Sequence, residues 1–312
     1  MINLESEMNK KYFSIVICTF NRPKKCIRTI KKILEQKFDD FSRLEIIVVD
    51  DNSDNKNSLI IKEFLNNKDI KYFRHQKNYG LSKARNTGIK NCNGKWFAFC
   101  DDDDYWPQGY LLKVNKIIKE SKNDVGIVLG FSKKYLSSYN KLIKKNNKLS
   151  NLILSGITPP VASQFYKKEL VDNVGGYNEN IKSGVDHDLW ISMVDKLNPC
   201  VDIAWGAEPK VSKEFNQSRM TLNEIKRKKG IADSLIIWRE TLVNRFGLKF
   251  YKHFCDSYMS YVEFTFFINR LPNLNLLILC KIFTNKYYFF YFRKTFLKLF
   301  KFNICNNFKN FY

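Results

Sequence analysis

The chain has 312 residues, of which 44% are hydrophobic and 15% aromatic, and it carries a formal net charge of +22. So many apolar side chains exclude an intrinsically disordered protein, and the length suffices for one large domain or for a domain of about 200 residues with an appendage. The positive charge predicts attraction to an anionic partner, such as nucleic acid, an acidic membrane surface or a phosphorylated substrate, without choosing among them.

The eight cysteines are scattered along the chain, with neither a CxxC pair nor the spacing of a zinc site. Such cysteines are typical of reduced, buried thiols. No signal peptide is recognisable before the first apolar run, because a basic, an apolar and a small-residue region do not follow one another there. These features predict a cytoplasmic protein.

Strand-like and helix-like segments alternate along the N-terminal part of the chain. The predicted strands are 13–18, 44–49, 70–74 and 96–100, and the predicted helices are 24–36, a segment ending near 66, and 81–92. This alternation predicts an α/β fold with a mostly parallel sheet and helices on both faces. Such sheets bind ligands at the carboxyl ends of their strands.

The pattern loosens beyond residue 133, where a Lys- and Asn-rich stretch precedes a strand-like run at 161–166. A helix is predicted to begin near Asp186. From about residue 220 the sequence becomes basic and helical, and from 245 aromatic residues alternate with lysines and arginines. The longest apolar run, 274–280, is far below the ~20 residues needed to span a bilayer.

Four adjacent aspartates, Asp101 to Asp104, directly follow the strand at 96–100. If partly buried, they would repel one another strongly without a cation. Residues i and i+2 of an extended or turn backbone point the same way, so Asp101 and Asp103 can converge on Mg²⁺ or Mn²⁺, which prefer oxygen ligands. A solvated acidic turn is the alternative. The apolar strand before the aspartates favours the metal site, and such an ion would stabilise a diphosphate leaving group.

Two further groups of residues suit a nucleotide. Asp50 and Asp51 close the second strand, where a carboxylate can accept hydrogen bonds from a base or a ribose, or can instead cap the next helix. The segment 78–88 supplies a helix N-terminus and the guanidinium of Arg85, both of which suit phosphate oxygens.

In this order, the motifs resemble those of the inverting family 2 glycosyltransferases with the GT-A fold. The family patterns (T/S)(Y/F)NR, VVDD(N/G)S, NxGxxxARNxG and FLDxDD correspond to residues 19–22, 48–53, 78–88 and 99–104. The resemblance implies a Rossmann-like GT-A domain at 1–220, with a nucleotide-sugar half at 12–133 and an acceptor half at 134–220. A helical, basic and aromatic C-terminal extension would occupy 221–312.

The resemblance also implies roles for single residues. Asp101 and Asp103 would bind the divalent metal, with Asp103 as the more direct ligand. The expected nucleotide-sugar contacts are Thr19, Phe20, Asn21, Arg22, Asp50, Asp51, Arg85, Asp101 and Asp102. The expected acceptor contacts are Asp104, Trp106, Asp188 and Trp190.

Asp186 aligns with the catalytic base of the family, in the stretch Gly184-Val185-Asp186-His187-Asp188. The reaction needs such a carboxylate to take the proton of the acceptor hydroxyl as that oxygen attacks the anomeric carbon. Asp188 is the second choice, because Val185 replaces the usual Glu, and a helix cap is the structural alternative for Asp186. We expect His187 to be a surface residue.

Many relatives carry a later histidine that faces the diphosphate or the metal, and the corresponding stretch 213–219 contains none. Either Asn216 or Arg219 replaces it, or the ion relies on aspartates, phosphates and water.

Together these features predict an inverting, metal-dependent glycosyltransferase that moves a hexosyl or N-acetylhexosaminyl group from a nucleotide sugar, with UDP the expected nucleotide. The acceptor would be a glycan or lipid-linked saccharide, as in bacterial surface polysaccharide or lipopolysaccharide synthesis. The basic, aromatic C-terminal region favours contact with the anionic inner face of the cell membrane, with an ordinary helical subdomain as the alternative.

Three other functions are less consistent with the sequence. A sugar-phosphate nucleotidyltransferase usually has a Gly-rich loop after the first strand, and residues 19–23 contain no glycine. Nucleic-acid binding would leave the aspartate clusters unexplained, because they repel phosphates. An inactive relative would not need the intact aspartate pair and a candidate base.

Overall fold

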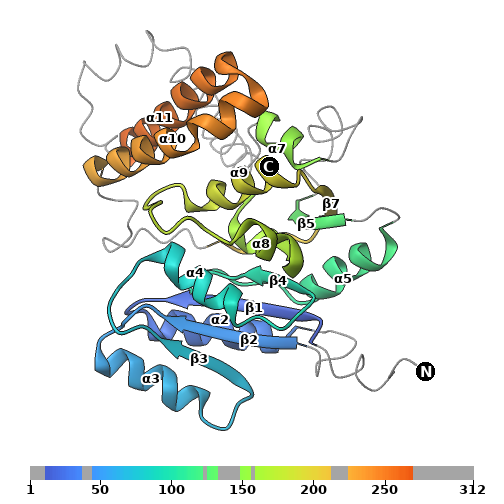
Figure 1. Cartoon of the computed structure of the whole chain (residues 1–312). Coiled ribbons are helices and arrows are strands. Elements are labelled where there is room, and N and C mark those ends of the chain that lie inside the picture. The colour runs from blue at the N-terminus through green and yellow to red at the C-terminus, as the bar shows by residue number, and fades with distance from the viewer. Residues whose placement is uncertain are drawn as a thin grey trace, which may run out of the picture. The chain divides into compact units, whose positions relative to one another are not determined.

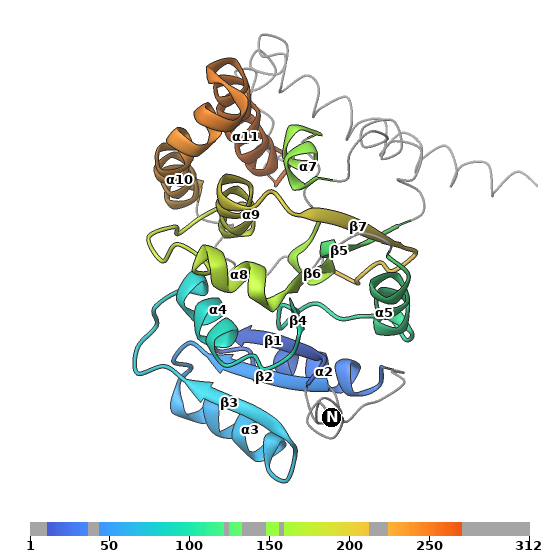
Figure 2. The ribbon, with the colours of Figure 1, turned by 45° about the vertical axis from the view of Figure 1, so that its right-hand side comes forward.

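The computed structural model describes residues 11–36, 44–121, 125–132, 148–155, 159–211 and 224–269. The chain divides into two compact units, Met1–Glu214 and Phe215–Tyr312. The first unit is built on one seven-stranded sheet with helices packed against it (Figures 1 and 2). Its described part confirms the predicted α/β fold with a mostly parallel central sheet.

The strands lie in the order β3-β2-β1-β4-β6-β5-β7. Strand β6 is antiparallel to both of its neighbours, and every other neighbouring pair is parallel. The strand bounds are β1 Phe13–Thr19, β2 Leu44–Asp50, β3 Ile70–Arg74, β4 Trp96–Phe99, β5 Val125–Phe131, β6 Gln164–Lys167 and β7 Cys200–Trp205.

The helices of the first unit connect these strands. Their bounds are α2 Pro23–Leu34, α3 Asn55–Leu65, α4 Leu81–Lys90, α5 Tyr110–Glu120, α7 Leu149–Ser155, α8 Lys168–Val174 and α9 Val185–Lys196. The sequence pattern predicted β1 to β4 and α2 to α4 to within a few residues. The run at 161–166 differs from its prediction, because Val161–Ser163 forms a 3₁₀ turn after Pro160 and only then does β6 begin.

The described part of the second unit, residues 224–269, consists of the helices α10 Glu224–Phe246 and α11 Leu248–Asn269. They are joined at Gly247, whose φ of +83° lies in the left-handed region that glycine adopts without steric cost. Helical structure here agrees with the predicted C-terminal helical region. Among the residues that the structure describes, no helix is long and apolar enough to cross a membrane.

Strand β1 shows why the first unit has two covered faces. Successive side chains of a strand point to opposite faces. Ile15 and Ile17 belong to the same core cluster as Ile30 of α2. Val16, between them, points the other way and packs on Gly88 of α4, where a Cβ would come within 2.3 Å of the valine side chain. Both faces of β1 are therefore buried, which explains why apolar side chains predominate in it.

The strand register gathers the polar residues of the sequence motifs at one edge of the sheet. Thr19, the last residue of β1, pairs with Asp50 of β2, and Asp50 pairs with Arg74 of β3. Strand β4 is parallel to β1 and leads directly into the aspartates that begin at Asp101. Residues separated by many positions in the sequence thus meet at the carboxyl ends of neighbouring strands.

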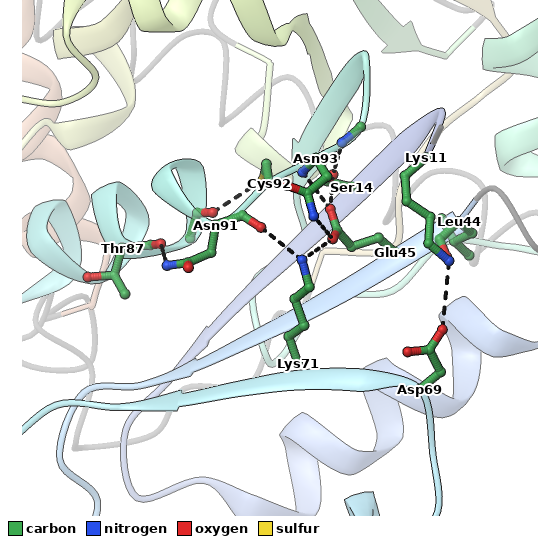
Figure 3. Close-up of polar contacts among 12 residues, drawn as sticks. Lys11, Ser14, Leu44, Glu45, Asp69, Lys71, Thr87, Asn91, Cys92 and Asn93 are labelled. Carbon is green, nitrogen blue, oxygen red and sulfur yellow. Dashed lines mark hydrogen bonds and ion pairs between the residues drawn. The ribbon is translucent and has the colours of Figure 1, made fainter. Parts of the chain in front are cut away.

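The opposite ends of these strands are joined by a buried carboxylate, Glu45 of β2 (Figure 3). Ser14 of β1 donates to Glu45 Oε1 over 2.5 Å, and the Asn93 N–H donates to the same oxygen over 2.8 Å. Lys71 of β3 lies 2.5 Å from Glu45 Oε2 and also donates to the Asn91 carbonyl. Burial alone would raise the pKa of Glu45, but the hydrogen bonds from Asn93, Lys71 and Ser14 outweigh it and lower that pKa.

We expect Glu45→Gln to destabilise the protein by about 2–3 kcal/mol at pH 7, because the amide removes the charge and places an NH₂ donor where a carboxylate oxygen accepted hydrogen bonds. The lowered pKa gives a stabilising contribution that is present above the unfolded pKa and lost as the pH falls through the folded one. The difference from wild type should therefore shrink as the pH is lowered below about 4.5. Urea unfolding at pH 7 and at pH 4 measures it.

Glu35→Gln is the matched control, because Glu35 is exposed at the C-terminal end of α2 and pairs with Lys32, three residues earlier. It should change stability by less than about 0.5 kcal/mol. An equal loss for Glu45→Gln at both pH values would show that the ionised carboxylate is not the source of the stabilisation.

Candidate active site

Helix α2 fixes the backbone of the loop from Asp101 to Asp104. The Asp104 N–H donates to the Asp101 carbonyl over 2.9 Å, which closes the loop into a turn. Thr29 Oγ1 lies 3.0 Å from the Asp102 carbonyl oxygen and 2.7 Å from that of Asp104, and Arg28 donates to the Asp103 carbonyl over 2.8 Å. These contacts hold the aspartate loop in one conformation.

The carboxylates of this loop are held by cationic and hydroxyl groups rather than left to repel one another. Thr19 Oγ1 donates to Asp102 Oδ2 over 2.7 Å, and Arg22 lies 2.7 Å from Asp102 Oδ1. Arg22 also lies 3.3 Å from Asp103 Oδ2. Burial raises the pKa of Asp102 to about 7, although Arg22 and Thr19 act in the opposite direction. Asp102 is thus fully buried, and its contacts stabilise the conformation of the loop.

Arg85 joins the aspartate loop to helix α9. Its guanidinium is 1% exposed and lies over the rings of Phe99 and Tyr177, at 5.2 and 5.4 Å from their centroids. It donates to Asp186 Oδ1 over 2.7 Å and to Asp101 Oδ1 over 3.4 Å. Burial alone would lower the pKa of Arg85, but Asp186 and Asp101 raise it well above its usual value. Arg85 therefore remains charged between two carboxylates.

Asp186 and Asp188 both lie in the first turn of α9, and the structure gives them different surroundings. The Asp186 side chain is 46% exposed. Asp188 is buried and accepts the N–H of Asn178 over 2.7 Å, so it holds the loop that precedes the helix. A base must reach its substrate. This requirement favours Asp186.

Asp50 and Asp51 are tied to the turns that follow their strand. Asp50 accepts the Ser53 N–H over 2.7 Å and the Tyr72 hydroxyl over 2.6 Å, and it is fully buried. Asp51 accepts the backbone N–H groups of Tyr79 and Gly80 over 2.9 and 2.8 Å. Asp50 therefore closes its own turn, whereas Asp51 holds the loop that leads into α4.

Phe20 and Asn21 follow β1 and differ in exposure and contacts. Phe20 is 43% exposed and presents an aromatic ring at the edge of the sheet. Asn21 has a φ of +55°, which asparagine tolerates better than most residues. Its side chain accepts the Asp54 N–H over 2.8 Å, and its own N–H donates to Ser53. Phe20 thus leaves its ring partly exposed, whereas Asn21 connects two turns.

The four predicted acceptor contacts are all buried. Asp104, Trp106, Asp188 and Trp190 are each at most 4% exposed. The Trp106 indole donates to the Ala162 carbonyl and stacks on Tyr110, and Trp190 donates to the Tyr166 hydroxyl over 2.9 Å. Large aromatic side chains at the end of a strand or on the inner face of a helix bury apolar area in the core. In this structure none of the four offers a surface to an acceptor.

Other predictions fall outside the described residues. They are the replacement of the family histidine by Asn216 or Arg219 and the aromatic, basic stretch beyond residue 269.

The structure also brings in residues that the sequence patterns did not single out. His75 Nδ1 lies 2.7 Å from Asp51 Oδ1, and Thr29 holds the aspartate loop. One signal for His75 was available in the sequence, because it directly follows the third strand as Asp51 directly follows the second. The contact of Thr29 across two elements had no local signal.

Comparison with known proteins shows which family and fold the chain resembles. Residues 14–174 match the model of the family described as "Glycosyl transferase family 2". Uncharacterized glycosyltransferases of three Rickettsia species are 33–34% identical over 188–199 residues, which are 58–61% of this chain and less than a third of each of those proteins. The GalNAc(5)-diNAcBac-PP-undecaprenol beta-1,3-glucosyltransferase of Campylobacter jejuni is 27% identical over 261 residues, which are 78% of this chain and 79% of that protein.

Two solved structures share the fold. S. aureus TarS 1–349 in complex with UDP-GlcNAc matches with a TM-score of 0.60 and 19% identity, over 85% of this chain and 76% of that one. The mannosyltransferase PcManGT from Pyrobaculum calidifontis, in complex with GDP-Man and Mn²⁺, matches with a TM-score of 0.60 and 14% identity, over 88% and 79%. Since the family model covers more than half of its residues, the chain belongs to glycosyl transferase family 2.

Proposed function

We propose that this chain transfers a hexosyl or N-acetylhexosaminyl group from a UDP-sugar to a hydroxyl of a glycan or lipid-linked saccharide, with inversion at the anomeric carbon. The observation that carries the proposal is the contact of Arg85 with both Asp186 and Asp101. It places a half-exposed carboxylate beside the aspartate loop at the carboxyl edge of the sheet. A base for the acceptor and a site for the donor diphosphate are thus adjacent.

Asp186 is the proposed base. Its carboxylate takes the proton from the acceptor hydroxyl while that oxygen forms a bond to the anomeric carbon. The bond between this carbon and the diphosphate oxygen breaks on the opposite side, and the diphosphate leaves with the bonding electrons. The proton on Asp186 then passes to solvent, which its 46% exposed side chain can reach.

Asp101 and Asp103 are the proposed ligands of a divalent cation, Mn²⁺ or Mg²⁺. Their oxygens are the donors that such hard ions prefer, and their side chains are 37% and 10% exposed. Among the described residues no group of three or more metal-binding side chains surrounds one point, so phosphate oxygens or water would complete the shell. Such an ion would neutralise the charge of the leaving diphosphate. The Mn²⁺ in the PcManGT complex supports this assignment.

Two similar proteins support the choice of substrates. TarS binds UDP-GlcNAc in its complex, and the Campylobacter enzyme carries an undecaprenol-linked saccharide in its name. The second unit of this chain has exposed lysines at Lys249 and Lys252, beside a row of rings formed by Phe246, Phe250 and Phe254. Cations beside aromatic rings suit the interface of an anionic membrane. We therefore propose a lipid-linked acceptor, met at the inner face of the cell membrane in surface polysaccharide synthesis.

A panel of UDP-, GDP-, CDP- and dTDP-sugars tests the proposal with the full chain and Mn²⁺. We expect release of UDP from one UDP-sugar, faster with a polyprenyl-diphosphate saccharide, and loss of this release with EDTA. Asp103→Asn should lower the rate by about 100-fold or more, because it removes a metal-binding charge. Asp172→Asn, on the exposed side of α8, is the control. Pyrophosphate release in place of UDP release would contradict glycosyl transfer.

A further inference from the structure

His75 lies at the same edge of the sheet as the proposed donor site. Strand β3 ends at Arg74, which pairs with Asp50 at the end of β2, so His75 and Asp51 follow their strands side by side. The His75 N–H donates to the Asp50 carbonyl oxygen over 2.9 Å and extends the ladder by one residue. The strand register therefore places the imidazole against the Asp51 carboxylate.

Both ring nitrogens of His75 have partners. Nδ1 lies 2.7 Å from Asp51 Oδ1, and Nε2 lies 2.9 Å from Oγ1 of Thr87 on α4. An ionised carboxylate only accepts hydrogen bonds, so Nδ1 carries a proton and donates it to Asp51. The Thr87 hydroxyl donates to Nε2 when the ring is neutral and accepts from Nε2 when the ring is charged. The contact with Asp51 is the same in both forms.

The ring has little freedom to turn. Its side chain is 10% exposed. The ring of Tyr79 lies edge-on to it, with 5.3 Å between the centroids and an interplanar angle of 86°. Thr87 contacts the other ring nitrogen, Nε2, so the ring presents Nδ1 to Asp51 in one orientation.

Most of the hydrogen-bond acceptor positions of the Asp51 carboxylate are occupied by groups of the protein itself. Oδ1 accepts from His75 Nδ1 and from the Tyr79 N–H, and Oδ2 accepts from the Gly80 N–H. A carboxylate offers about four lone-pair positions. Among the contacts between described residues, one position on Oδ2 is left for another donor. The Asp51 side chain is 8% exposed, so a ligand can approach it.

We propose that His75 is a positioning residue for nucleobase selection, which orients Asp51 so that Oδ2 accepts an N–H from the base of the donor. The inference rests on the proposed function, which puts a nucleotide sugar at this edge. A fixed carboxylate favours a base with an N–H, such as N3–H of uracil or N1–H of guanine. It disfavours cytosine in the same orientation, because the N3 of cytosine is an acceptor and would face another acceptor.

Calorimetric titration of the full chain with UDP, GDP and CDP, in the presence of Mn²⁺, tests this role. His75→Phe keeps a ring beside Tyr79 but removes both nitrogens. It should weaken binding of the preferred diphosphate by about 10-fold or more and leave CDP binding unchanged, since a hydrogen bond to a charged group contributes about 1.5–3 kcal/mol. His75→Asn, whose amide can donate where Nδ1 does, should stay within about threefold of wild type.

Two more variants complete the set. The Gln side chain in His75→Gln can reach Thr87 but cannot donate to Asp51 as Nδ1 does. This variant should therefore lose the preference for one nucleobase, as His75→Phe does. It replaces His75→Phe in the experiment if the phenylalanine variant does not fold. Gln76→Ala changes an exposed neighbour in the same loop and should bind like wild type.

The outcomes separate this inference from the proposed function. Equal weakening of all three diphosphates in both His75→Phe and His75→Gln, or an unchanged preference, overturns the role of His75 while the donor site stands. A wild-type chain that binds none of the diphosphates contradicts the proposed function itself, and the inference with it.

Discussion

Asp186→Asn should lower the rate of sugar transfer by about 10²- to 10⁴-fold, which is the usual contribution of a general base. The amide has nearly the shape of the carboxylate and can still accept the hydrogen bond of Arg85, but it cannot take a proton from the acceptor hydroxyl. Binding of UDP should change by less than about threefold, because Asp186 acts on the acceptor. Steady-state kinetics with donor and acceptor, beside titration with UDP, measure both quantities.

Asp188→Asn is the informative comparison, because it lies on the same turn of α9 and is buried. Its amide oxygen can still accept the Asn178 N–H, so turnover should stay within about tenfold of wild type while the melting temperature falls. If Asp188→Asn abolished transfer at unchanged stability, and Asp186→Asn did not, then the base would be Asp188.

Arg85→Lys should lower kcat by about 100-fold, equivalent to about 2.7 kcal/mol of transition-state stabilisation. A lysine is one compact charge, whereas the guanidinium reaches two carboxylates at once and lies close to the rings of Phe99 and Tyr177. The variant would therefore leave Asp186 poorly oriented relative to Asp101. We expect the affinity for UDP to stay within about threefold, because the buried Arg85 has no surface left for a phosphate.

A loss of UDP affinity in Arg85→Lys would instead assign Arg85 to donor binding. If Arg85 binds the diphosphate, as the family resemblance implied, then Arg85→Lys should weaken UDP binding by about tenfold or more at a nearly unchanged kcat. Lys83→Ala controls for changes on α4, because Lys83 is on the same helix and pairs with Glu179 at the surface. It should leave both quantities as in wild type.

Much of the fold could be predicted from the sequence because its signals are local. Apolar strands such as 13–18 and 44–49 must be buried on both faces, and helical periodicity between them fixes a parallel arrangement. The antiparallel strand β6, Gln164–Lys167, had a weaker signal. Its run begins with a 3₁₀ turn, and only its pairing between β4 and β5 makes it a strand.

The sequence by itself also determined the family and the candidate chemistry. The aspartates from Asp101 to Asp104, together with Asp50, Asp51 and Asp186, stand at the ends of predicted strands or at a helix start, and this can be read without coordinates. Such motifs can be recognised because each one is a short, continuous segment of the sequence.

Only the tertiary structure decided which of these side chains face solvent and which pair with each other. Trp106, Trp190 and Asp188 carried the residue types of a binding site, yet packing buries them. Arg85 and Asp186 are 101 positions apart, and their contact over 2.7 Å exists because α4 and α9 meet at one edge of the sheet. Exposure and pairing depend on segments distant in the sequence, so no local pattern could fix the direction of Arg85 or the choice of Asp186 over Asp188.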